Sequence, residues 1–113
     1  MENIIFNELK LRGFNVDVGV VEYNYKDSEG KSWRSKLEVD FIANLGSKKF
    51  YIQSALNIDD EQKKEQETAS LNRIDDSFSK IVVVKDNIEP WQDDKGIQYI
   101  GIEQFLLEED WLR

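Results

Sequence analysis

The stretch from Leu37 to Leu56, LEVDFIANLGSKKFYIQSAL, constrains the fold more than any other part of the chain. Apolar and polar residues alternate along its first half, which is the period of a strand with one packed face. A Gly-Ser turn follows at residues 46–47, and a second alternating run comes after it. The stretch therefore predicts two strands joined as a hairpin.

Each strand of this hairpin has two chemically distinct faces. On the first strand, the apolar residues Trp33, Leu37, Val39 and Phe41 fall at odd positions, and the polar residues Arg34, Lys36, Glu38 and Asp40 fall at even ones. On the second strand, Phe50, Ile52 and Leu56 share one face, and Tyr51, Gln53 and Ala55 share the other. We therefore expect the odd positions of the first strand to pack and the even positions to form a polar face.

The aromatic residues are interpreted mainly as core. We expect Phe6, Trp33, Phe41 and Phe50 to be buried. Trp91 follows Pro90 in an acidic loop, which would suit an exposed contact, although core packing is the preferred interpretation for it as well.

The elements before the hairpin are a helix and a strand. Apolar residues predict a largely buried helix over residues 2–12, and Gly13 is a usual stop signal. Valines and tyrosines alternate from Val16 to Tyr25, but their phase shifts at Val21, which indicates a bulge or strong twist. Residues 26–31, KDSEGK, are the predicted turn into the hairpin.

The elements after the hairpin complete an α/β domain. Strong helix formers predict a helix over residues 59–74 with Asp59 as its N-cap. A β-branched run predicts a strand over 80–86 that is covered on both faces, and a loop over 87–96 leads to a strand over 97–102. A final helix is predicted over 102–113. The order α-β-β-β-α-β-β-α predicts one domain over residues 1–113, with a central mixed sheet flanked by helices.

Composition restricts the chemistry that this domain can perform. The 113 residues include no cysteine and no histidine, which excludes disulfides, Cys/His zinc sites, thiol nucleophiles and imidazole bases. Carboxylates with Mg²⁺ remain, together with lysine, tyrosine and hydroxyl groups. The sequence has no apolar run long enough to span a membrane and no signal for secretion, so we expect a cytoplasmic protein without membrane contact.

The net charge of −8 is unevenly distributed. Residues 1–57 hold eight acids and eight bases, so the whole excess of acids lies in residues 58–113. Nucleic acids bind through Lys and Arg, and such an acidic chain is a poor general binder of them. The segment from Lys26 to Lys49 is mildly basic, with six bases against four acids.

Three acids are candidate site residues. Glu38 and Asp40 lie two positions apart on one strand, so their carboxylates leave the same face about 7 Å apart along the backbone. They could share a binding site, or they could lie on a solvated face that Arg34 and Lys36 partly neutralise. Glu2 could belong to a site, or it could simply stabilise a helix N-terminus.

In combination these residues resemble the PD-(D/E)XK superfamily, the restriction-endonuclease-like fold that includes archaeal Holliday-junction resolvases. The matching residues are Glu2 on the first helix, Asp40 in EVDF, and Gln53 with Ala55 in the tripeptide QSA. The resemblance covers residues 2–86 and implies a core of order α-β-β-β-α-β with an additional C-terminal strand and helix. It also implies that an Asp and the first residue of the tripeptide hold Mg²⁺.

A closer resemblance covers nearly the whole chain. The pieces ENIIFNELKLRGFNVDVG, EVDFIA and YIQSAL, followed by a charged helix, resemble the C-terminal domain of unknown function that follows the ATPase module in many prokaryotic AAA+ type ATPases. This resemblance implies that residues 1–113 are the C-terminal part of a longer ATPase. ATP would then bind only in the upstream module.

The tripeptide QSA departs from the nuclease pattern in its charges. Gln53 offers a neutral oxygen where the resembled nucleases have a carboxylate, and Ala55 replaces the lysine that acts on the attacking water. We therefore expect a catalytically degenerate accessory or recognition domain with no cofactor of its own. Its partners would be its own ATPase module and another protein, and its charge disfavours nucleic acid.

Two alternatives remain open. An active Mg²⁺-dependent DNA nuclease or resolvase-like enzyme would use Asp40, Glu2 and Gln53, with Glu38, as metal ligands, and Lys36 as the replacement for the missing lysine. A purely structural oligomerisation module is the third possibility.

Overall fold

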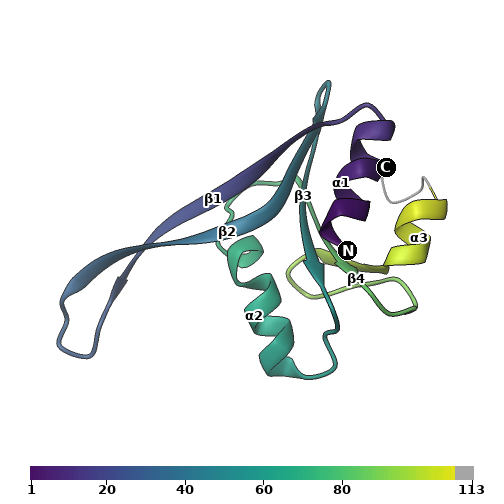
Figure 1. The fold of residues 1–113 in the computed structure, drawn as a ribbon. Coiled ribbons are helices and arrows are strands. Elements are labelled where there is room, and N and C mark those ends of the chain that lie inside the picture. The colour runs from purple at the N-terminus through teal and green to yellow at the C-terminus, as the bar shows by residue number, and fades with distance from the viewer. Residues whose placement is uncertain (109–113) are drawn as a thin grey trace.

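The structure is a computed structural model that describes residues 1–108 (Figure 1). Its elements are α1 (Glu2–Leu11), β1 (Asn15–Lys26), β2 (Ser32–Leu45), β3 (Lys48–Ala55), α2 (Glu61–Asn72), β4 (Ser79–Val84), β5 (Trp91–Gln92), β6 (Ile97–Gly101) and α3 (Ile102–Leu107). The sequence predicted all of these except β5, which lies in the loop expected over residues 87–96. None of the helices within residues 1–108 is long and apolar enough to cross a membrane.

The described strands form one mixed sheet of order β1-β2-β3-β4-β6-β5. The first three strands are antiparallel neighbours, as the hairpins require. β4 runs parallel to both β3 and β6, and β5 is antiparallel to β6. The parallel pair β3–β4 needs a crossover, which α2 supplies.

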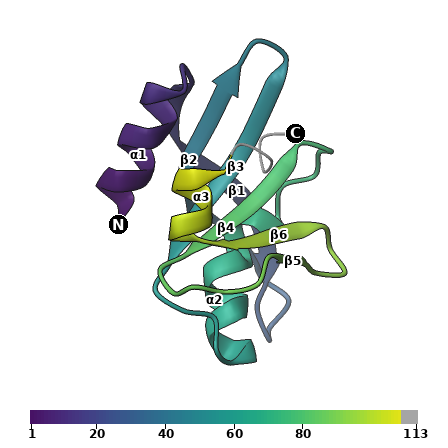
Figure 2. The same ribbon diagram turned by 90° about the vertical axis from the view of Figure 1, so that its right-hand side faces the viewer.

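Helices cover both faces of the sheet (Figures 1 and 2). One face packs against α1 and α3. The residues buried between this face and the two helices are Ile5, Leu9, Phe14, Phe41, Ala43, Phe50, Ile52, Ile81, Val83, Ile100 and Phe105. The other face packs against α2. The residues buried between this face and α2 are Val39, Tyr51, Ala55, Leu71, Val82, Val84, Ile97 and Tyr99. We call these the α1-side and α2-side clusters. Successive residues of β4 alternate between them, which confirms both the α/β class and the prediction of a strand buried on two faces.

A bulge in β2 changes the packing predicted for that strand. Asp17 pairs with Ile42 and Gly19 pairs with Val39, so β2 carries one more residue than β1 over this step. The extra residue falls at Asp40 and Phe41. As a result Val39 packs in the α2-side cluster while Phe41 packs in the α1-side cluster. The expectation that the odd positions of β2 share one packed face is therefore wrong.

Several apolar residues predicted to be buried are exposed. Trp33 lies far out on the β1–β2 hairpin and is 44% exposed, and Phe6 on α1 is 40% exposed. Trp91 is 42% exposed, although its ring stacks on Tyr99. Leu56 follows the end of β3 and is 67% exposed, so it does not share the packed face of Phe50.

The helix boundaries follow their end signals with two differences. α1 ends at Leu11, and Gly13 adopts a φ of +90°, which suits glycine after a helix. The N-cap of α2 is Asp60 rather than the predicted Asp59, because the Asp60 side chain accepts a hydrogen bond from the Lys63 N–H. α3 ends at Leu107, and residues 109–113 of the predicted final helix lie outside the described residues.

Gly101 allows the loop after β4 to approach β6 closely. A Cβ at this position would lie 2.9 Å from the Asp86 carbonyl oxygen and 3.5 Å from the Asn87 Cα. Because backbone atoms would have to shift, we expect Gly101→Ala to lower the free energy of unfolding by about 1–3 kcal/mol. Urea unfolding would measure the loss. A loss below about 0.5 kcal/mol would contradict this close approach.

Candidate functional site

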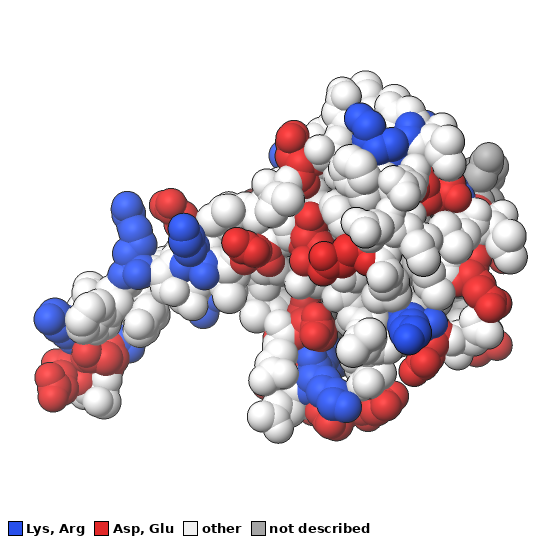
Figure 3. All heavy atoms as spheres, viewed as in Figure 1, with Lys and Arg blue, Asp and Glu red and all other residues white. Residues whose placement is uncertain are grey.

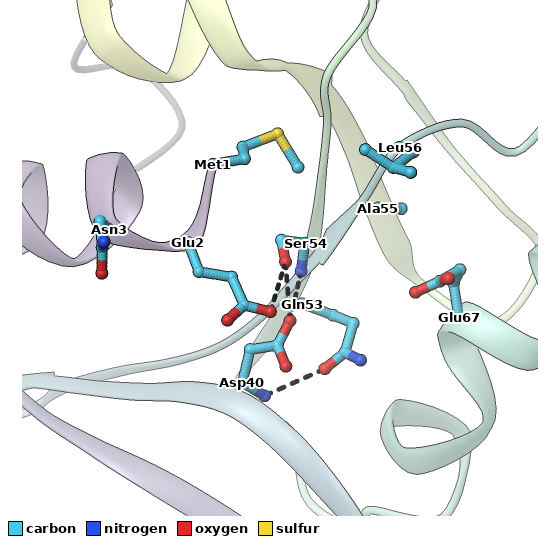
Figure 4. A pocket seen from close by; sticks show the side chains of 9 residues that line it. All are labelled: Met1, Glu2, Asn3, Asp40, Gln53, Ser54, Ala55, Leu56 and Glu67. Atoms are coloured by element: carbon cyan, nitrogen blue, oxygen red, sulfur yellow. Dashed lines mark hydrogen bonds between the residues drawn. The ribbon is translucent and has the colours of Figure 1, made fainter.

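An open pocket of about 520 Å³ lies where α1 begins, at the ends of the paired parts of β2 and β3 (Figure 4). Its lining residues are Met1, Glu2, Asn3, Asp40, Gln53, Ser54, Ala55, Leu56 and Glu67. The pocket thus brings together four residues that the sequence marked as site candidates, namely Glu2, Asp40, Gln53 and Ala55. It adds three polar residues that the sequence did not mark, Asn3, Ser54 and Glu67.

The bulge in β2 places Asp40 beside Ser54. The Asp40 carboxylate accepts a hydrogen bond from the Ser54 backbone N–H at 2.9 Å. The same oxygen lies 2.8 Å from the Ser54 hydroxyl, which donates to it. Both groups are half-buried, so these bonds are less exposed to competition from water than bonds at a free surface.

A third hydrogen bond runs between the same strands in the opposite direction, with its donor on β2 and its acceptor on β3. The Gln53 side-chain oxygen accepts from the Asp40 backbone N–H at 3.1 Å. The regular backbone pairing of β2 with β3 stops at the pair Phe41 and Ile52. The side chains of Asp40 and Gln53 therefore continue the connection between the strands past the point where backbone pairing ends. We call this set of three hydrogen bonds the splice.

Glu2 approaches the splice from the first turn of α1. Its carboxylate lies 3.4 Å from the Ser54 hydroxyl oxygen, farther than the Asp40 carboxylate. The hydroxyl has one proton, so it donates to one carboxylate at a time. Glu2 also lies in the first turn of its helix, where a negative charge is favourable. Its carboxylate is exposed and can face a ligand in the pocket.

Glu67 reaches the pocket from α2, on the other side of Gln53 (Figure 4). Burial raises the pKa of Glu67, and the nearby charge of Asp40 raises it further. Helical spacing offered a signal for this residue, because Glu67 lies four positions before the buried Leu71 and so faces the same side of α2. A carboxylate on the packed side of a helix is unusual and points to a polar pocket.

Glu67 gives the pocket a testable dependence on pH. Because its folded pKa lies above its ordinary value, the folded state holds the Glu67 proton more tightly than the unfolded state does, and stability falls as the pH rises through this range. We therefore expect Glu67→Gln to raise the melting temperature at pH 7 and to have no such effect near pH 3.5. Thermal unfolding at both values would measure this. An equal gain from Glu65→Gln, at an exposed position of the same helix, would contradict the assignment.

Two of the candidates lie away from the pocket, and a third lines it without contributing a polar group. Glu38 is exposed, sits two residues before Asp40 and does not line the pocket. Lys36 is exposed farther out on β2, opposite Glu22 of β1. Ala55 is buried in the α2-side cluster and presents only a methyl group. The structure therefore joins Asp40, Gln53 and Glu2, and it separates Glu38 and Lys36 from them.

The residues present fit Mg²⁺ poorly. A divalent ion would need carboxylate oxygens free to coordinate it, but the Asp40 oxygen nearest Ser54 already accepts two hydrogen bonds and the Gln53 oxygen accepts one. Within residues 1–108, no group of three or more His, Cys, Asp or Glu side chains is placed to hold a metal ion. These side chains therefore connect β2 to β3 by hydrogen bonds, and carboxyl groups line the pocket beside them.

Comparison with known proteins gives one informative similarity. An uncharacterized protein of Haemophilus influenzae is 34% identical over 108 residues, which cover 96% of this chain and 23% of that protein. The chain thus spans less than a quarter of the length of the relative that it matches. No protein-family profile and no solved structure matches the chain.

Proposed function

We propose that this chain is a catalytically degenerate domain of restriction-endonuclease-like fold. It serves as an accessory or recognition domain of a longer prokaryotic AAA+ type ATPase in the cytoplasm, and it binds a partner protein. In this proposal the domain has no cofactor of its own, and ATP binds only in the upstream module.

The splice is the observation that carries the proposal. Asp40 and Gln53 occupy the positions that the resemblance assigns to metal binding, yet their polar atoms connect β2 to β3. Ala55, at the position of the resembled lysine, is packed among apolar side chains. Such a site keeps the fold of a nuclease. It lacks the free carboxylate and the lysine that would hold a metal ion and act on the attacking water.

Two further observations support the fold and the setting. The order α1-β1-β2-β3-α2-β4, with helices on both faces of a mixed sheet, agrees with the core that the resemblance implies. The matching region in the Haemophilus influenzae protein occupies under a quarter of that chain, which supports a domain that works within a longer protein.

Calorimetric titration with Mn²⁺ and Mg²⁺ tests the proposal. We expect no binding stronger than a dissociation constant of about 1 mM. The matched variant is Glu2→Gln, which removes a pocket carboxylate without breaking the splice, and we expect it to behave like the wild type. Tighter binding that Glu2→Gln or Asp40→Ala weakens, together with cleavage of branched or single-stranded DNA, would overturn the proposal.

An active Mg²⁺-dependent nuclease is the second candidate, and one observation favours it. Glu2, Asp40 and Glu67 line the same pocket, so the charge that a cation needs is present even though its geometry is not. In that case Asp40, Glu2 and Gln53 would hold the ion, and the ion would supply Lewis-acid activation of water. Glu38 would have to move to reach it.

The ATPase setting has its own check. The gene that encodes this chain should encode a GxxxxGK[ST] phosphate-binding loop upstream of it. Removing the domain from the full-length protein should then change its ATPase rate or its capture of the partner protein, and unchanged values for both would contradict an accessory role.

A further inference from the structure

The hairpin of β1 and β2 extends beyond the rest of the sheet as a two-stranded arm (Figure 1). Pairing of β2 with β3 begins only at Phe41, whereas pairing with β1 continues out to Lys26 and Ser32. We call residues 20–38 the arm. An isolated two-stranded ribbon is marginally stable in water, so the arm gains stability from a further strand.

β1 lies at one edge of the sheet, and within residues 1–108 it pairs with β2 alone. It has 12 residues, whereas β5 at the other edge has two. A long edge strand without proline presents a row of unpaired backbone N–H and C=O groups, on which another strand can pair. The free edge of β1 is therefore the part of the arm that can accept a further strand.

The turn of the hairpin shows which residues of β1 face this free edge. The Asp27 N–H donates to the Lys31 carbonyl at 3.0 Å, so these two residues form a hydrogen-bonded pair. Hydrogen-bonded and non-hydrogen-bonded pairs alternate along an antiparallel ladder, so the odd-numbered residues of β1 in the arm bond to β2. The backbone N–H and C=O groups of Glu22, Asn24 and Lys26 therefore point away from β2. All three residues are exposed.

One register makes this edge complementary to a second copy of itself. Antiparallel pairing centred on Asn24 places Glu22 of each copy directly opposite Lys26 of the other, and opposite charges across strands are favourable. Centring on Glu22 instead would place two glutamates opposite each other, and centring on Tyr23 would place Lys26 opposite Val20. Neither Glu22 nor Lys26 makes an ion pair within residues 1–108, so both charges are available. Charge thus favours the register centred on Asn24.

The same register pairs aromatic residues on the opposite face of the arm. Tyr23 of each copy lies opposite Tyr25 of the other, and Tyr25 is paired with Trp33 within its own hairpin. The rings would therefore form a continuous row across the two arms. Tyr25 is 45% exposed and Trp33 is 44% exposed, so both rings are available. Aromatic pairs across strands contribute about 0.2–1 kcal/mol each.

The arm is the neutral part of an acidic chain. Residues 20–38 hold four acids and four bases, so the other residues carry the entire net charge of −8. Figure 3 shows side chains of both signs on the arm and acidic side chains over the middle of the same view. Antiparallel pairing of two arms leaves the acidic remainder of each copy at opposite ends, where salt screens the repulsion between them. Two acidic copies can therefore meet at their arms.

We propose that two copies of this chain pair through the free edges of their β1 strands, antiparallel and centred on Asn24. The two arms then form one four-stranded ribbon of order β2-β1-β1-β2. This pairing satisfies the outward backbone groups of residues 22–26 in both copies. It also closes the assembly, because each β1 edge in the arm is covered by the other.

Sedimentation over a range of concentrations tests the dimer. We expect wild-type protein to dimerise with a dissociation constant of roughly 1–100 μM, and Asn24→Pro to raise this constant at least tenfold. Proline removes the outward N–H of residue 24 but is tolerated on an edge strand, so the monomer should keep its circular dichroism spectrum. Asn24→Thr keeps the N–H and should dimerise like the wild type. Wild-type protein that stays monomeric up to roughly 500 μM would overturn the dimer and leave this edge to a strand of another protein.

Exchange of charges tests the register without proline. Glu22→Lys and Lys26→Glu should each weaken self-association, because each variant places like charges opposite each other twice. A mixture of the two variants should form a heterodimer, since every such pair then joins opposite charges. Single variants that dimerise as well as the wild type, or a mixture that shows no preference for the heterodimer, would contradict the register.

Cysteine cross-linking tests the position of the two-fold axis. The chain has no cysteine, so Asn24→Cys introduces a single thiol at the centre of the proposed pairing. The Cα atoms of a hydrogen-bonded pair lie about 5.5 Å apart, which suits a disulfide. Mild oxidation should therefore link Asn24→Cys into a dimer and leave Val20→Cys, an exposed position on the same strand, unlinked. Equal linking of both variants, or of neither, would overturn this arrangement.

Discussion

Replacing Asp40 with alanine is expected to lower the free energy of unfolding by about 2–4 kcal/mol, because a charged acceptor that serves two partly buried donors is lost. The Ser54 backbone N–H and hydroxyl both donate to the Asp40 carboxylate. Without this carboxylate, the Ser54 N–H would lose its acceptor on β2, because backbone pairing between β2 and β3 ends at Phe41 and Ile52. Urea unfolding monitored by tryptophan fluorescence would measure the loss.

Two controls separate the splice from a general effect of charge. Asp17→Ala removes an exposed carboxylate from the neighbouring strand and should change stability by less than about 0.5 kcal/mol. Ser54→Ala combined with Asp40→Ala should cost less than the sum of the two single losses, because the two side chains share one hydrogen bond. Additive losses would contradict the hydrogen bond between the two side chains. An Asp40→Ala protein as stable as the wild type would show that Asp40 does not stabilise the pairing of the two strands.

Tyr99→Ala is expected to have the largest effect, a loss of about 3–5 kcal/mol. Tyr99 is completely buried in the α2-side cluster, and its ring stacks on Trp91 with the ring centres 4.1 Å apart. Its hydroxyl donates to the Asp93 carboxylate at 2.8 Å. Burial raises the pKa of Tyr99, and the hydrogen bond to Asp93 raises it further, so the hydroxyl stays protonated at neutral pH.

Conservative variants divide this effect into packing and hydrogen bonding. Tyr99→Phe keeps the ring and removes only the hydroxyl, so we expect a loss of about 1–2 kcal/mol. Tyr25→Ala removes an exposed tyrosine and should lower the free energy of unfolding by less than about 1 kcal/mol. Chemical unfolding of the three variants would measure these values. A Tyr99→Ala loss no larger than that of Tyr25→Ala would contradict the placement of Tyr99 in the core.

Most of the fold could be predicted because local patterns determine it. Strict alternation gave the strands on either side of Gly46, where φ is positive and the turn needs glycine. The β-branched residues of β4 predicted a strand covered on both faces, and both clusters contain its side chains. Signals of this kind depend on neighbouring residues alone, so a single sequence is enough to read them.

The bulge could be located only in part. The shift of apolar phase along residues 16–25 was interpreted as a bulge or twist in that strand, but the extra residue lies across the ladder in β2. β1 itself alternates regularly. Its apolar phase changes because Val16 packs on the α1 side, whereas Val21 packs on the α2 side farther out. A change in which helix covers a strand is a tertiary effect that no local pattern reports.

The residues that line the candidate site could be predicted largely from the sequence, but the hydrogen bonds of Ser54 among them could not. Asp40, Gln53 and Glu2 do meet at one pocket. Ser54 was overlooked because it is the unspecified middle residue of the tripeptide, yet it connects two of them. Alternation along its strand predicts that Trp33 is buried, but Trp33 is exposed. Alternation does not show which residues of a long hairpin extend past the neighbouring strand β3.

Amide hydrogen exchange at Asp40 and Ser54 tests most directly whether this pair of strands is held by its side chains. In the monomeric wild-type protein, both amides should exchange much more slowly than the amide of Asn24, an exposed residue in the outer part of the β1–β2 hairpin. Protection at Asp40 should fall in Gln53→Ala, and protection at Ser54 should fall in Asp40→Ala. Rapid exchange of both amides in the wild type, or protection that neither substitution lowers, would contradict a structural role for these residues.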